Sequence, residues 1–262
     1  MTTIYPATDF LLEKRFYKEV VENIPDGIYP ESEQIAYDVQ NQIVSHLTFH
    51  NQSSICGYKL ACTNDAAKRA LGVSGPFSGC MLSHSTYSSG KSLVADDFVL
   101  RIVEQEFAFL LGEDIPNTDI PYTADTIIPF IGALVPAIEV VDHRYRDFTK
   151  VGKGALIADN AIHGASILGP RVSDWQHLDL SQYPTQLFVN DALFSEGSSS
   201  NVLGSPLNAL AWITNHLQSQ GIKLTAGKFI TTGVVCDIYP ARKGDQIRAD
   251  FGELGSTSLS FE

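Results

Sequence analysis

Residues 101–110 read Arg101-Ile102-Val103-Glu104-Gln105-Glu106-Phe107-Ala108-Phe109-Leu110. The apolar and β-branched side chains of this run are typical of a buried strand. Because successive side chains of a strand point to opposite faces, we expect Glu104 and Glu106 to project from the same face. Two adjacent buried carboxylates repel each other, so the pair favours a nearby cation, and a hard divalent metal such as Mg²⁺ prefers oxygen ligands. An edge strand with a solvated glutamate face is the alternative that these residues leave open.

Length and composition bound the class of protein. The 262 residues are 44% hydrophobic and 18% charged, which is ordinary for a globular protein and argues against global disorder. The formal net charge of -12 argues against nucleic acid or an anionic membrane as a partner, since phosphate contacts need clustered Lys and Arg. A small anionic substrate stays compatible with this charge, because a bound metal reverses the sign of the local field.

Targeting signals and cysteines bear on the compartment. Residues 1–9 contain no basic region followed by an apolar run, and the sequence has no apolar segment long enough to span a bilayer. We therefore expect a cytoplasmic protein. The cysteines match no zinc spacing and are interpreted as reduced, mostly buried thiols, with a disulfide as the alternative; they are Cys56, Cys62, Cys80 and Cys236.

Two helices are expected in residues 1–50. The first begins at Phe10 with Asp9 as its cap, and its apolar side chains recur as far as Val21. The second follows Ser32, and its apolar side chains step by four along one face: Ile35, Val39, Ile43 and Leu47. We interpret residues 1–50 as a helical layer on residues 51–262, which form the catalytic β-rich core of a single domain.

The segment after the helical layer changes in character. A strand at 57–61 leads into a helix that Thr63 or Asn64 caps and that Gly72 ends. Residues 74–92 are rich in serine and glycine and are interpreted as a loop. Such a loop either covers an active site or lies on the plain surface.

The C-terminal third contains a hairpin, a helix and strands. Residues 186–189 with Asn190-Asp191 indicate the hairpin, and 195–200 is expected to be a flexible loop. Ser205 and Pro206 are typical of a helix start. Further strands are expected at 229–235, 246–251 and 256–261. The predicted fold class is α+β, with a largely antiparallel sheet system that carries helices on its outside.

Glu139 is the most informative single residue, because it lies inside the strongly apolar run 127–142. A glutamate in such surroundings is unfavourable unless it is paired. It offers a third carboxylate for a metal. The charged residues 142–147 are interpreted as a hydrogen-bonded loop in which His143 is a minor candidate base. Lys59 also lies among apolar residues, where it either extends to the surface or is held in a pocket.

Several short motifs follow one another in a fixed order. They are Gly57-x-Lys59, Arg101-x-x-Glu104-x-Glu106, Ile138-Glu139-Val140-Val141-Asp142, Asp159-Asn160 and Ser205-Pro206-Leu207-Asn208. In this combination the chain resembles the hydratase/decarboxylase branch of the fumarylacetoacetate hydrolase superfamily over nearly its whole length. The resemblance implies the mixed β-sheet roll of that superfamily, with helices packed outside. It also implies a homo-oligomer that can associate with another pathway enzyme.

The activity that the resemblance implies is a metal-dependent hydratase. Its substrate would be a short 2-oxo-enoic (2-hydroxydienoic) acid of aromatic meta-cleavage catabolism. The alternative is decarboxylation of a 2-oxo-dioate through the same enolate. The implied cofactor is Mg²⁺ or Mn²⁺, held by Glu104, Glu106 and Glu139. Catalytic roles are expected for Lys59 and Asp159, and substrate contacts for Lys59, Arg101, Asn160 and Gly233.

The chain departs from the family pattern near the expected chemistry. After Gly79, where relatives carry a short acidic segment, it has Leu82-Ser83-His84-Ser85. Ile162 stands where a serine usually follows Asp159-Asn160-Ala161, His163 comes next, and Val234 replaces a late serine. These changes leave the metal ligands intact. Either the substrate differs and His84 or His163 transfers protons instead, or activity is weakened and the chain serves as a scaffold.

Overall fold

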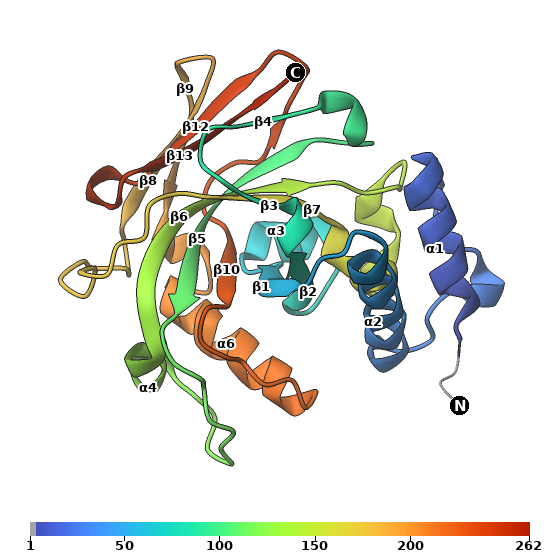
Figure 1. The fold of residues 1–262 in the computed structure, drawn as a ribbon, viewed down its shortest axis with the longest axis horizontal. Coiled ribbons are helices and arrows are strands. Elements are labelled where there is room, and N and C mark those ends of the chain that lie inside the picture. Colours follow the sequence, from blue (N-terminus) through green and yellow to red (C-terminus); the bar gives the residue numbers. More distant parts are fainter. Residues whose placement is uncertain (1–3) are drawn as a thin grey trace.

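Two β-sheets and an outer set of helices build the molecule (Figure 1). The structure is a computed structural model that describes residues 4–262. The larger sheet has the strand order β2 (Phe77–Leu82), β1 (Ile55–Ala61), β10 (Phe229–Val234), β5 (Ile102–Leu111), β6 (Ile131–Val141), β7 (His163–Leu168), β3 (Thr86–Ser88), with β11 (Tyr239–Pro240) against β5. The smaller sheet has the order β4 (Lys91–Leu93), β13 (Ser256–Phe261), β12 (Gln246–Asp250), β8 (Pro184–Val189), β9 (Ala192–Ser198).

Strand β5 lies inside the larger sheet, between β10 and β6, so the edge-strand alternative is wrong. Its side chains alternate as a strand requires. Gln105 donates hydrogen bonds to backbone carbonyls of β8 and β12 in the smaller sheet. Phe107 follows on the same face and contacts Phe251 edge-on. Glu104 and Glu106 lie on the opposite face, which confirms the predicted pairing of the two carboxylates.

Helices cover the sheets from outside. They are α1 (Pro6–Tyr17), α2 (Glu33–His50), α3 (Asp65–Leu71), α4 (Ala124–Ile127), α5 (Gly152–Ala158) and α6 (Pro206–Ser219). In Figure 1, α1 and α2 stand to one side of the larger sheet, and α6 runs below it. A core that includes Leu11, Ile43 and Leu156 joins α1, α2 and α5. Within residues 4–262, no helix is both long and apolar enough to cross a membrane.

The first helix differs from its prediction. Helix α1 begins at Pro6, its N-cap is Tyr5, and Asp9 lies in its first turn. Proline favours this earlier start, because its fixed φ suits the first helical position and its missing N–H is not needed there. Helix α1 ends before Val21. The second helix follows its prediction, since the Ser32 side chain accepts the N–H of Ile35.

Residues 74–92 are largely strands, so the prediction of a loop is wrong. They contain β2, β3 and β4, and every residue of β2 is buried. Gly79 marks a close approach and no turn, since a Cβ there would lie 2.7 Å from the Asn160 carbonyl oxygen. Strand β9 likewise extends into the predicted flexible loop at 195–200.

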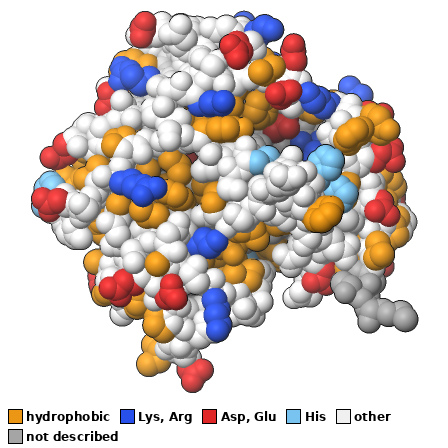
Figure 2. Space-filling model, in the orientation of Figure 1, with side chains coloured by type: hydrophobic (Ala, Val, Ile, Leu, Met, Phe, Trp, Pro, Cys, Tyr) orange, Lys and Arg blue, Asp and Glu red, His pale blue; other side chains and the backbone are white. Residues whose placement is uncertain are grey.

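The remaining C-terminal predictions are confirmed. The hairpin of β8 and β9 turns at Asn190 and Asp191, both with positive φ. Ser205 caps α6, and β10, β12 and β13 lie where strands were expected. The α+β class is confirmed, although parallel pairs make both sheets mixed. On the face seen in Figure 2, Lys and Arg side chains are dispersed among apolar and acidic ones and form no single basic patch.

Candidate metal centre and its cavity

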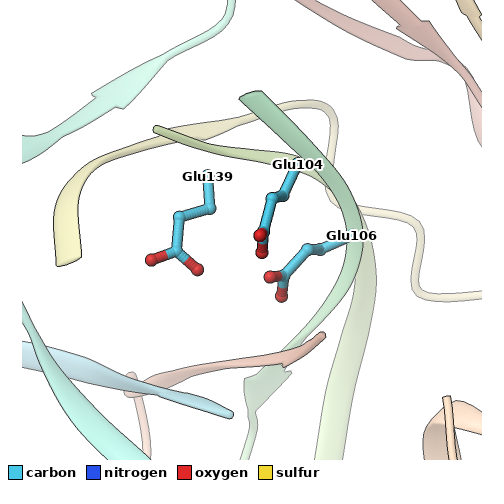
Figure 3. Close-up of side chains that lie close together, drawn as sticks. All are labelled: Glu104, Glu106 and Glu139. Carbon is cyan, nitrogen blue, oxygen red and sulfur yellow. The ribbon is translucent and has the colours of Figure 1, made fainter. Parts of the chain in front are cut away.

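Three glutamate side chains converge on one face of the larger sheet (Figure 3). One carboxylate oxygen from each of Glu104, Glu106 and Glu139 lies within 4.8 Å of the others. The pairing of β5 with β6 sets Glu104 directly opposite Glu139, and Glu106 follows on the same face. Hydrogen-bonded strands therefore fix the backbone of all three ligands before any ion binds.

Burial governs the ionisation of these glutamates. Burial and the neighbouring Glu139 raise the pKa of Glu104 to about 7. The same two causes, with Glu104, raise the pKa of Glu106 well above its ordinary value. Burial also opposes ionisation of Glu139, but Lys59 and His163 outweigh it and lower the pKa of Glu139 to about 2. Three ionised carboxylates are therefore unfavourable together in the metal-free cluster, and a bound cation would favour the ionised forms of Glu104 and Glu106.

Lys59 is buried beside the cluster, so the surface alternative for it is wrong. Its ammonium nitrogen lies 3.1 Å from Oε1 of Glu139 and donates a hydrogen bond to the carbonyl oxygen of Ala161 at 3.0 Å. Burial disfavours its charged form, but the three glutamates outweigh this and raise the pKa of Lys59. Lys59 is therefore an ammonium at the centre of the site.

The donor set fits a divalent cation. Glu106 Oε1 and Glu139 Oε2 are buried and have no hydrogen-bond partner. The other oxygen of Glu106 accepts the N–H of Gly233 at 2.8 Å, and the other oxygen of Glu139 lies 2.9 Å from Nδ1 of His163. Buried carboxylate oxygens without partners are unfavourable. A hard cation such as Mg²⁺ would satisfy both, because it takes carboxylate oxygens as ligands.

Gly233 is a requirement of this geometry. Its φ of +100° is strained for other residues, and a Cβ there would lie 2.1 Å from Oγ1 of Thr63. Glycine thus lets the backbone N–H reach Glu106 while Thr63 packs against it. Thr63 Oγ1 is itself buried without a partner.

A left-handed turn at Asn160–Ile162 shapes the other side of the site. Asn160, Ala161 and Ile162 have φ of 54°, 49° and 54°, which is uncommon for non-glycine residues and strained for isoleucine. The Asn160 side chain holds the turn by exchanging two hydrogen bonds with the backbone of Cys80, at 2.7 and 2.9 Å. The turn directs the Ala161 carbonyl at Lys59.

A cavity of about 290 Å³ reaches the cluster at Glu104. Lys59 and Gly233 also line it, together with apolar side chains from α3, from strands and from loops. Sequence reasoning missed these walls, because no local motif marks Phe77 or Phe148 as neighbours of the glutamates. A second, more polar pocket of about 690 Å³ adjoins the cavity and shares Thr63, Asn64, Ala66, Val234, Cys236 and Asp237 with it.

The family described as "Fumarylacetoacetate (FAA) hydrolase C-terminal" matches residues 78–260, a range that includes the three glutamates. The chain belongs to the fumarylacetoacetate hydrolase family. The resemblance inferred from the motifs is thereby confirmed. The known relatives of this family member include hydratases and a decarboxylase.

Two curated hydratases are similar to this family member over most of its length. The 2-oxo-hept-4-ene-1,7-dioate hydratase of Escherichia coli is 30% identical, and the match covers 89% of this chain and 88% of the relative. The 2-keto-4-pentenoate hydratase of Burkholderia vietnamiensis (strain G4) is 30% identical, with 87% and 85% covered. Among solved structures, 4-oxalocrotonate decarboxylase from Pseudomonas putida G7, complexed with magnesium and adipate, has a TM-score of 0.89 at 25% identity, with 98% and 96% covered.

Asp159 is not brought to the glutamates in this hydrolase-family chain. Its carboxylate oxygens pair with Arg144 at 2.6 Å and with Arg15 of α1 at 2.8 Å. Arg144 also pairs with Asp142 at 3.0 Å. This buried network anchors α1 to the residue that precedes the left-handed turn. Sequence reasoning identified the charged run at 142–147 but missed Arg15, which is remote in sequence.

The two histidines lie in different places. His163 is buried, with Nδ1 facing Glu139 and with Nε2 lacking a hydrogen-bond partner. His84 is exposed, and its Nδ1 lies 3.0 Å from Oγ of Ser53. Partial desolvation of the ring, together with the nearby His163 and Arg15, lowers the pKa of His84. Only His163 joins the carboxylates.

Arg101 does not line the cavity. Its guanidinium donates to the backbone carbonyls of Ala95 and Ala241, which fastens the start of β5. The Asn160 amide is likewise taken up by the backbone of Cys80. Of the residues expected to contact substrate, the structure therefore places Lys59 and Gly233 in the cavity lining.

Proposed function

We propose that this family member is a divalent-metal-dependent hydratase of a short 2-hydroxydienoic (2-oxo-enoic) acid. One observation carries the proposal: a three-glutamate cluster with two buried, unpartnered oxygens lies beside the buried Lys59, and Lys59 and Glu104 line a cavity. The relatives named as hydratases, at 30% identity over most of the chain, support the reaction type.

Glu104, Glu106 and Glu139 would hold Mg²⁺ or Mn²⁺. Such an ion supplies Lewis acidity and positive charge for a 2-oxo acid. Gly233 orients Glu106 through its N–H, and His163 orients Glu139 through Nδ1. Hydrogen bonds to the second oxygen of a ligand fix its direction, so both residues are proposed as positioning residues.

Lys59 is proposed as the catalytic cation. Ketonisation of the dienol moves a proton from the 2-hydroxyl group to the terminal carbon and leaves an enone. Water then adds its oxygen to C4 and a hydrogen to C3. Both steps pass through an enolate with negative charge on the 2-oxygen, which a fixed ammonium stabilises. The Ala161 carbonyl and Glu139 hold the Lys59 ammonium in place for this purpose.

Asp159 and His163 take different roles in this proposal. Asp159 is engaged by two arginines and is proposed as a positioning residue for the left-handed turn. His163 has a free Nε2 and is the histidine available for proton transfer at the cluster. His84 is exposed and bonded to Ser53, so it ranks below His163.

The assembly is part of the same proposal. The family resemblance implies a homo-oligomer, and α1 and α2 expose Phe16 (73%) and Phe49 (88%), which offers apolar surface for a second copy. The native mass of the purified chain tests this. A monomeric mass at micromolar concentration would contradict it.

The test of function supplies Mg²⁺ and 2-hydroxypenta-2,4-dienoate to the purified chain. We expect loss of the dienol absorbance and formation of 4-hydroxy-2-oxopentanoate, identified by NMR. The second candidate is decarboxylation of a 2-oxo-dioate, which the similarity to 4-oxalocrotonate decarboxylase favours. Release of CO₂ from 2-oxohex-3-enedioate, without hydration of the dienoate, would replace the first candidate by the second. Metal binding without either turnover would support a scaffold role.

A further inference from the structure

We infer that the substrate has an uncharged, apolar tail and that the cavity discriminates against a second, distal carboxylate. The inference rests on the proposed function, because it takes the head of a 2-oxo acid to lie at Lys59 and the glutamates. It concerns the remainder of the cavity, which receives whatever is attached to that head.

The walls away from the glutamates are apolar. Helix α3 turns Ala67, Ala70 and Leu71 toward the cavity, since residues three and four apart share one helix face. Phe77, Phe148 and Ile162 contribute further apolar lining. Apolar walls favour a hydrocarbon tail, which leaves water on entering the cavity.

The lining offers no cation for a second carboxylate. Lys59 is the one basic residue among the residues that line the cavity, and Glu139 and the Ala161 carbonyl already engage it. The lining also contains Asp237, which would repel a second carboxylate. A carboxylate buried without a cation or hydrogen-bond donors is strongly disfavoured.

Basic residues just outside the lining are also engaged. Lys68 of α3 pairs with Asp65 at 3.2 Å. Lys153 pairs with Glu33 at 2.8 Å. A distal carboxylate would therefore meet a lysine whose charge an acidic side chain already compensates.

Two uncharged polar side chains, those of Thr63 and Asn64, also line the cavity. Thr63 Oγ1 packs against Gly233, next to the glutamates, where it is available to the head of the substrate. The Asn64 side chain accepts the N–H of Ala67 and caps α3. Both side chains are uncharged, so neither provides the cation that a buried distal carboxylate needs as a partner.

Val234 adds to the same apolar surface as Ile162, since both line the cavity. The volume of about 290 Å³ is at the small end of ligand pockets, which suits a tail of a few carbons.

The experiment compares two unreactive acids on the Mg²⁺-loaded chain by calorimetry. 2-Oxohexanoate and 2-oxoadipate share the head and the number of carbons, and they differ in a terminal methyl group or carboxylate. We expect 2-oxohexanoate to bind at least about tenfold more tightly. Equal or tighter binding of 2-oxoadipate would overturn the inference.

A variant places a cation where the wall lacks one. Ala70 is exposed on α3 and lines the cavity, so Ala70→Arg should fold and should shift the preference at least about tenfold toward 2-oxoadipate. Ile120→Arg is the matched control, because Ile120 is 77% exposed and lies outside the lining. An Ala70→Arg preference equal to that of Ile120→Arg would contradict the assignment of the tail to this wall.

Binding and turnover separate this inference from the proposed function. Selective binding of 2-oxohexanoate without hydration of any dienoate would leave the tail assignment standing and overturn the hydratase. Hydration of the dienoate with equal binding of both acids would leave the hydratase standing and overturn the tail assignment. Binding of neither acid, together with no hydration of the dienoate, would overturn both.

Discussion

The ammonium nitrogen of Lys59 lies 3.1 Å from Oε1 of Glu139, although their strands are not neighbours in the sheet. Strands β10 and β5 separate β1 from β6, so the contact spans the curled face of the larger sheet. Both groups are buried. Because burial removes the water that would otherwise stabilise each charge, the ammonium and the carboxylate stabilise each other.

Replacing Lys59 removes the buried cation and leaves the carboxylates. We expect Lys59→Met to lower the free energy of unfolding of the metal-free chain by about 3–5 kcal/mol, as breaking a buried ion pair does. Saturating Mg²⁺ should recover much of the loss, because the ion compensates the same charges. Urea unfolding with and without Mg²⁺ measures the loss of stability and its recovery by the ion. An equal loss with and without the ion would contradict a shared electrostatic role.

The raised pKa values of Glu104 and Glu106 predict how the stability of the metal-free chain depends on pH. A carboxyl group whose folded pKa is raised binds more protons when folded, so stability is lost as the pH rises through that pKa. The pKa of Glu104 is raised to about 7, so the loss should be visible between about pH 5 and pH 8.

Glu106→Gln tests the same point with one charge removed. The metal-free variant should lose less stability over that pH range, and its stabilisation by Mg²⁺ should weaken. Glu113→Gln is the control, since Glu113 is exposed and lies outside the cluster. If Glu106→Gln followed the wild-type pH curve, the carboxylate would not be the destabilising group.

Gly233→Ala tests the glycine beside the cluster. The added Cβ would collide with Thr63 and displace the N–H that Glu106 accepts. We expect weaker Mn²⁺ binding, by at least about tenfold, and lower stability. Gly244→Ala is a matched control, because Gly244 also has positive φ but has nothing within 4 Å of an added Cβ. If the two variants weakened Mn²⁺ binding equally, the collision with Thr63 would not be the cause of the weaker binding.

The pairing of Glu104 with Glu106 could be predicted from local rules, whereas the place of Glu139 beside them was implied only by the family resemblance, because it depends on the pairing of β5 with β6. Alternation along one strand puts Glu104 and Glu106 together, and a glutamate in an apolar run, as at Glu139, needs a partner. Residues 74–92 could not be predicted, because serine and glycine suggest a loop even where, as at Gly79, glycine allows a strand to approach the turn at Asn160 closely.

The rest of the site depends on contacts that are distant in sequence. Asp159 was expected at the reaction centre, but its partner Arg15 comes from the first helix and holds it elsewhere. The wall of the cavity joins α3 to Phe77 and Phe148, which no local pattern links. Contacts between residues so far apart in sequence depend on the tertiary packing of the whole chain, which local sequence patterns do not specify.

Asp159→Asn separates a positioning role from a catalytic one. The substitution leaves the buried Arg144 without full compensation, so we expect a loss of about 3–5 kcal/mol of folding free energy. The folded variant should still bind Mn²⁺, because Asp159 lies outside the glutamate cluster. Asp147→Asn removes a solvent-accessible ion pair with Lys150 and keeps an oxygen that can accept the N–H of Thr149, so it should change neither property much. An Asp159→Asn chain of normal stability but without turnover would favour a catalytic role.

Metal dependence of hydration tests the account most directly. The chelated chain is titrated with Mg²⁺ while the hydration of 2-hydroxypenta-2,4-dienoate is followed. The three glutamates predict almost no turnover without the ion and a rise that saturates at one ion per chain. Hydration by the thoroughly chelated chain at the rate of the Mg²⁺-loaded chain would contradict the account.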